Sequence, residues 1–108
     1  MEIKDFAVTL NQIKNERMCS TVTARLEKGL LWIEGLEFGP YVESFWGDEK
    51  HEYSYSLNYE DTAYLFELIK DYGTPKGVFF ARFGGENACE KFAEFCRANG
   101  LKVKYTSV

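Results

Sequence analysis

Histidine, proline and cysteine are scarce in this chain of 108 residues, which has one, two and three of them. The cysteines, Cys19, Cys89 and Cys96, are an odd number, so they cannot all pair in disulfides. No C-x-x-C or H-x-x-x-H spacing offers a zinc site, and no EF-hand loop is present. We therefore expect free thiols in a reducing compartment, no metal and no cofactor.

Long hydrophobic runs are also missing. The longest, Leu30–Ile33 and Val78–Ala81, are far shorter than the roughly 20 residues that a membrane-spanning helix needs. Residues 1–5 are mostly charged and lack the apolar segment of a secretory signal. These features predict a cytoplasmic protein that does not associate with membranes.

Aromatic residues, in contrast, are abundant. They make up 17% of the chain, and hydrophobic residues together make up 45%. Large flat side chains of this number can build a substantial core in a chain of domain size. We expect residues 1–108 to form a single folded domain.

The net charge of −4 is unevenly distributed along the chain. Residues 34–61 contain eight acids and one base, a balance of −7, whereas the remainder has a balance of +3. Such a negative segment repels phosphate groups and attracts cationic surfaces. It predicts a basic protein as the partner rather than a nucleic acid.

Alternating apolar and polar residues predict four strands, near residues 4–10, 21–26, 30–36 and 51–57. A two-residue turn at Lys28-Gly29 would align the apolar residues of the second and third strands on one face. The same register places Trp32 opposite Arg25, where the indole ring could stack on the guanidinium group.

Helical patterns follow the fourth predicted strand. Asn58 is suited to cap a first helix, Pro75 to open a second, and residues 86–98 form a third before a strand at 101–106. Strands in a run followed by helices in a run indicate an α+β fold. We predict an antiparallel sheet of about four to five strands, in the order β-β-β-β-α-α-α-β, with the helices packed on one face.

His51 is the candidate for acid–base chemistry because it stands among acidic residues. Strand alternation, however, places Glu49 and His51 on one side and Glu52 on the other. A Cys–His nucleophile would require a cysteine beside His51 in the folded chain. A small hydrolase or ligand-binding enzyme centred on His51 and nearby carboxylates is therefore the alternative hypothesis, and a non-enzymatic role is favoured.

Residues 38–55 combine aromatic and acidic side chains. Some ten of these residues connect the third and fourth predicted strands, where hairpin loops usually span two to five. Their rings could cap the core or serve as anchors in an interface with another protein. The candidate partner-binding residues are Tyr41, Glu43, Phe45, Trp46, Asp48, Glu49 and Glu52.

The segment G-L-E-F-G-P-Y-V-E-S-F-W-G-D-E-K-H-E-Y-S-Y, residues 35–55, resembles a stretch shared by small bacterial proteins of uncharacterised function. Small acidic α+β proteins of this kind often look like immunity proteins, which bind and neutralise a toxin domain. The resemblance implies no enzyme activity and supplies no catalytic residues.

Our leading hypothesis is accordingly a non-enzymatic binding protein, such as an immunity protein against a basic toxin. The carboxylates of residues 38–55 would steer association, and the aromatic side chains would supply anchors. A homo-oligomer that pairs through an edge strand is a further alternative.

Overall fold

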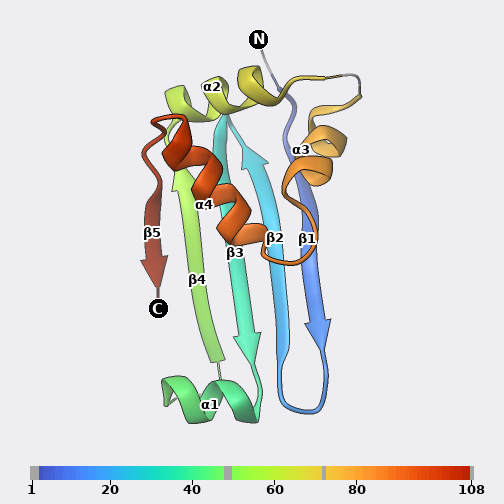
Figure 1. The fold of residues 1–108 in the computed structure, drawn as a ribbon, viewed down its shortest axis with the longest axis vertical. Helices are drawn as coiled ribbons and strands as arrows, with labels where there is room; N and C mark the ends of the chain where they lie inside the picture. The colour runs from blue at the N-terminus through green and yellow to red at the C-terminus, as the bar shows by residue number, and fades with distance from the viewer. Residues whose placement is uncertain (1–2, 48–49, 72, 108) are drawn as a thin grey trace.

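In a computed structural model, which describes residues 3–47, 50–71 and 73–107, the chain forms an α+β fold and confirms the predicted class (Figure 1). Its elements are β1 (Phe6–Lys14), β2 (Cys19–Glu27), β3 (Leu30–Phe38), α1 (Pro40–Trp46), β4 (Lys50–Leu57), α2 (Tyr59–Ile69), α3 (Pro75–Phe83), α4 (Ala88–Ala98) and β5 (Lys104–Ser107). None of the helices in these ranges is long and apolar enough to cross a membrane.

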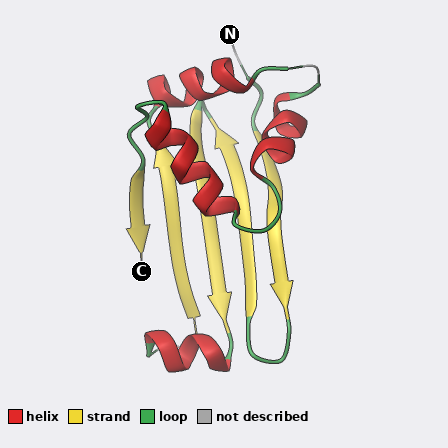
Figure 2. Ribbon diagram, in the orientation of Figure 1, coloured by secondary structure: helices red, strands yellow, loops and turns green. Residues whose placement is uncertain are grey.

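The five strands form one antiparallel sheet in the order β1-β2-β3-β4-β5, so each strand pairs with its neighbour in sequence. Helices α2, α3 and α4 lie on one side of the sheet toward one end, and α1 lies at the opposite end (Figure 2). Each strand therefore has one face turned toward the helices and one turned away from them.

The predicted order of elements is right except for α1, which lies between β3 and β4. Gly39 has a φ of 126°, and a Cβ there would lie 2.7 Å from the carbonyl oxygen of Arg17. Pro40 then takes a first-turn position, and Gly47 ends the helix with a left-handed φ of 83°. The sequence pattern predicts only a connection here because seven residues are too few to establish a helical period.

The β2–β3 hairpin confirms the predicted turn and register. Lys28 and Gly29 have φ values of 52° and 80°, as a type I′ turn requires. Arg25 lies opposite Trp32, and the guanidinium carbon is 5.4 Å from the centroid of the indole ring. The stacking expected from the sequence is therefore present.

β1 extends further than the alternation predicts. Its pairing with β2 shifts between Thr9 and Asn11, which marks a bulge, and then continues to Lys14. Residues 11–14 look like a loop in the sequence because most of their side chains are polar.

The core lies between the sheet and the helices and is largely aromatic. Phe79, Phe83 and Phe92 are each at most 1% exposed. Their ring centroids lie 4.8 to 6.4 Å apart, within the range of favourable aromatic pairs. From the strands, Leu31 and Ile33 complete this core with no measurable exposure. The helix-covered face therefore carries the stability of the fold.

We expect Phe79→Ala to lower the free energy of unfolding by about 3–5 kcal/mol because it leaves a cavity in this core. The neighbouring Phe80 is 46% exposed, so Phe80→Ala is the matched control and should cost no more than about 0.5 kcal/mol. Urea unfolding of both variants measures the difference. Equal losses would show that Phe79 does not fill the core.

Stability should also fall at alkaline pH. Burial raises the pKa of the Cys96 thiol to about 12, and the negative charge of Asp61 adds to the shift. The folded state thus holds this proton more tightly than the unfolded chain does. This difference contributes fully to the free energy of unfolding below the ordinary thiol pKa of about 8.5. The contribution is lost as pH rises toward the pKa of the thiol in the folded state.

We expect Cys96→Ala to reduce the loss of unfolding free energy between about pH 8 and about pH 11. The two proteins are compared by the slope of the free energy of unfolding against pH, because the substitution also leaves a small cavity at every pH. Urea unfolding across this range measures it. Parallel curves for wild type and variant would contradict the shift.

Candidate functional site

The face of the sheet turned away from the helices is set by strand register. Trp32 pairs with Arg25 on β2 and with Ser56 on β4, and Glu34 pairs with Thr23 and Ser54 in the same way. We call this surface the open face. On the three central strands it comprises Cys19, Thr21, Thr23, Arg25, Glu27, Leu30, Trp32, Glu34, Leu36, Phe38, Lys50, Glu52, Ser54 and Ser56.

An apolar row runs along the middle of the open face. Four of the five β3 residues there are apolar: Leu30, Trp32, Leu36 and Phe38. Phe38 is 44% exposed, and the other three are half-buried between neighbouring side chains. A sheet covered on one side ordinarily presents polar residues on the other. An apolar row in this position is typical of a surface that a partner covers.

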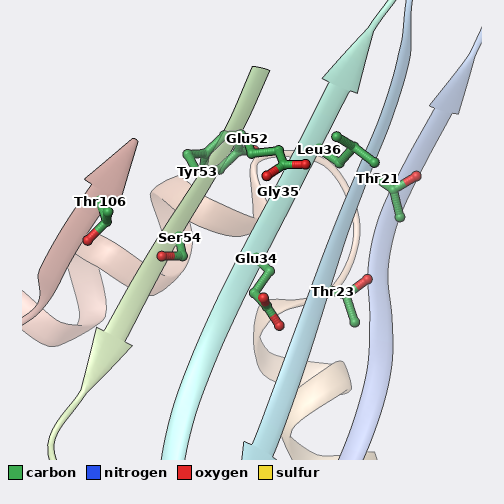
Figure 3. Close-up of a pocket in the computed structure, with 9 residues that line it drawn as sticks. All are labelled: Thr21, Thr23, Glu34, Gly35, Leu36, Glu52, Tyr53, Ser54 and Thr106. Carbon is green, nitrogen blue, oxygen red and sulfur yellow. The ribbon is translucent and has the colours of Figure 1, made fainter. Parts of the chain in front are cut away.

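A shallow hollow lies beside this row on the open face (Figure 3). Its side chains supply hydroxyl groups from β2, β4 and β5 and carboxylates from β3 and β4. Its lining residues are Thr21, Thr23, Glu34, Gly35, Leu36, Glu52, Tyr53, Ser54 and Thr106. The hollow therefore offers hydrogen-bond donors and acceptors as well as negative charge.

Both carboxylates of the hollow are held by bases of the same face. Arg25 Nε lies 2.9 Å from Glu34 Oε1, and Lys50 Nζ lies 2.7 Å from Glu52 Oε1. All four side chains are at least 36% exposed. Exposed ion pairs of this kind are worth about 0–1 kcal/mol, so a partner's cation could replace Arg25 or Lys50 at little cost.

Of the seven residues predicted to bind a partner, the structure describes the side chains of three. Glu52 lies in the hollow of the open face, whereas Tyr41 and Glu43 are exposed on α1. Tyr41 lines a different hollow, with residues 15–18 of the β1–β2 loop. The side chains of Phe45 and Trp46, and residues Asp48 and Glu49 entirely, lie outside the described part of the chain.

Sequence reasoning missed the apolar row and the hydroxyl groups beside it. The signal for the apolar row is present in the run Leu30–Ile33, which is apolar at consecutive positions and therefore on both faces of the strand. Such a run is typical of a strand that is covered on both sides. The helices cover only one side of β3, so the second apolar side was the informative feature.

His51 lies on the opposite, helix-covered face and is 6% exposed. Its Nε2 is 3.1 Å from Ser107 Oγ on β5, and its Nδ1 is 3.7 Å from Glu37 Oε2 on β3. The ring centroid of Tyr53 is 5.7 Å away. With Cys89, which contacts Tyr53, these residues form what we call the histidine cluster. As alternation predicts, Glu52 is on the other face of β4.

Tyr53 and Cys89 are both held in their neutral forms. Tyr53 Oη lies 3.8 Å from Cys89 Sγ. Burial is the largest cause that raises the pKa of each group, and the charge of Glu37 acts in the same direction on both. Cys89 is therefore a protonated thiol near neutral pH, which makes it a poor nucleophile despite its place in the cluster.

Among the described residues, no three His, Cys, Asp or Glu side chains are placed to hold a metal ion together. Comparison with known protein families, with curated proteins and with solved structures finds no match for this chain. The two sites therefore have to be interpreted from their own chemistry.

Gly35 lies opposite Tyr53 on the helix-covered face, and the ring of Tyr53 lies across it. A Cβ at Gly35 would be 2.0 Å from Tyr53 Cζ. We expect Gly35→Ala to lower the free energy of unfolding by about 1–3 kcal/mol, since the ring would have to move. The same substitution in a Tyr53→Ala background should cost much less. Chemical denaturation of the four proteins tests this, and equal costs in both backgrounds would contradict the contact.

Proposed function

We propose that this protein is a protein-binding domain whose binding function requires no catalysis, and that the open face is its binding surface. The observation that carries the proposal is the apolar row of Leu30, Trp32, Leu36 and Phe38 on the uncovered side of the central strand. Interfaces commonly have an apolar centre inside a polar rim. Here the hydroxyl groups and carboxylates on β2 and β4 would form that rim.

The dimensions of the open face suit a protein better than a small molecule. A nine-residue strand such as β3 spans roughly 30 Å at about 3.3 Å per residue, and five strands about 4.8 Å apart cover roughly 20 Å. The face thus offers on the order of 600 Å², close to the roughly 800 Å² that each partner contributes to a standard interface. A small ligand would instead need a deeper cleft.

The open face carries charges of both signs, and its carboxylates are the groups that a basic partner could use. Glu34 and Glu52 both line the hollow, and Glu27 is exposed on the same face. Lysine or arginine side chains of a partner could pair with these carboxylates and accelerate association. A basic toxin is one such partner, in agreement with the immunity function that the resemblance of residues 35–55 implies.

Affinity capture from a lysate of the native host, followed by mass spectrometry, would identify the partner. Trp32→Ser removes the largest side chain of the apolar row and should weaken binding of that partner by at least about tenfold. Tyr64→Ser is the matched control, since Tyr64 is 49% exposed on α2. Amide NMR spectra verify that both variants fold.

The charges are tested separately by Glu34→Lys/Glu52→Lys. We expect this double variant to slow association with the captured protein and to weaken the dependence of the rate on salt. Stopped-flow kinetics at several salt concentrations would measure both effects. Equal binding by wild type, Trp32→Ser and the double variant would overturn the proposed surface, and so would an acidic partner.

A further inference from the structure

Three side chains of the histidine cluster stand in a row across three adjacent strands. Glu37 on β3 pairs directly with His51 on β4, and Ser107 on β5 pairs with Tyr53, two residues further along β4. All three side chains are on the helix-covered face. Ser107 is exposed on the edge strand, whereas the side chain of His51 behind it is only 7% exposed.

The distances in this row suit proton transfer from serine to histidine. Ser107 Oγ is 3.1 Å from His51 Nε2, which is within reach for a general base. On the other side of the ring, Glu37 Oε2 is 3.7 Å from Nδ1. That distance exceeds a hydrogen bond, but such contacts often shorten when substrate binds. The order of hydroxyl, imidazole and carboxylate is the order found in serine hydrolases.

We propose that Ser107 is a nucleophile activated by His51, that Glu37 positions the imidazole, and that the protein hydrolyses small carboxylic esters. This activity would be additional to the proposed binding function, and it uses the opposite face of the sheet. The substrate class follows from the location of Ser107. All four β5 residues are exposed, so an unhindered ester can approach the hydroxyl without entering a cleft.

In the first step Ser107 Oγ attacks the carbonyl carbon and its proton passes to His51 Nε2. The ester C–O bond then breaks, and the leaving alcohol takes that proton. In the second step a water molecule attacks the acyl-serine and gives its proton to Nε2. Breaking the bond to Oγ returns the proton to Ser107 and releases the carboxylic acid.

Cys89 is the other nucleophile of the histidine cluster, but its contact is with Tyr53. Tyr53 also stacks near His51, with ring centroids 5.7 Å apart, so it closes one side of the imidazole. The accessible nucleophile is therefore the serine on the edge strand.

A fluorophosphonate probe, which labels activated serines, tests the nucleophile directly. Intact-mass and peptide analysis should find one adduct at Ser107. Ser107→Ala should abolish it, and His51→Gln should slow its formation at least about 100-fold. Ser54→Ala, on the open face, is the matched control and should label like wild type. No adduct, an adduct elsewhere, or equal labelling of His51→Gln would overturn the proposal.

Hydrolysis of p-nitrophenyl acetate gives a second readout. Because a free imidazole also cleaves this ester, the decisive comparison is Ser107→Ala, which keeps His51 in place. We expect its rate to fall to that of free imidazole at the same concentration, which is the background that His51 alone can supply. A wild-type rate in folded Ser107→Ala would contradict a serine nucleophile.

The role of Glu37 can be read from the chain's only histidine, since its ring nitrogens give unambiguous ¹⁵N NMR signals. Glu37→Gln should change the tautomer balance seen in these signals and slow labelling of Ser107 by about tenfold or more. Unchanged ring signals in a folded variant would exclude Glu37 as the positioning residue. Normal labelling in this variant would also exclude that role.

Discussion

The structure depends on the packing of α2, α3 and α4 against a single face of the sheet. The aromatic side chains of α3 and α4 close that face around Phe79 and Phe92, both with no measurable exposure. Because this one interface supplies the core, β1–β5 do not need their second face for stability. The second face can therefore carry side chains that the core does not require.

β3 shows most clearly how one strand serves both faces. Leu31 and Ile33 enter the core, while Trp32 and Glu34 between and beside them belong to the open face. At Gly35 the side chain is absent so that Tyr53 can lie across the strand. The open face and the histidine cluster are therefore back to back, separated by the thickness of a single sheet.

Local sequence signals predicted the elements that local interactions form. The Lys28-Gly29 turn determines its own hairpin, and Asn58 caps α2 by accepting a hydrogen bond from the Asp61 amide at 2.7 Å. α1 escaped prediction because its boundaries are set by Gly39 and Gly47 rather than by an apolar period. Where the pattern was long enough, the sequence thus predicted both the type of an element and the face on which its side chains lie.

The sites were less predictable because they depend on contacts between distant residues. Ser107 lies 56 positions from His51 in sequence, and only the pairing of β5 with β4 joins them. Likewise, Glu34 and Glu52 share a hollow through the register of β3 and β4. Residues 38–55 look like one surface in the sequence, but alternation along β4 places His51 and Glu52 on opposite faces.

Hydroxyl-radical footprinting of the protein with its captured partner tests the central claim most directly, because it reports on side chains rather than on the backbone. Phe38 on the open face and Phe80 on α3 are 44% and 46% exposed, so they form a matched pair. The open face as binding surface predicts that Phe38, Trp32 and Leu36 become protected while Phe80 stays as reactive as in the free protein. Protection of Phe80 with unchanged Phe38 would place the partner on the helices and contradict the account.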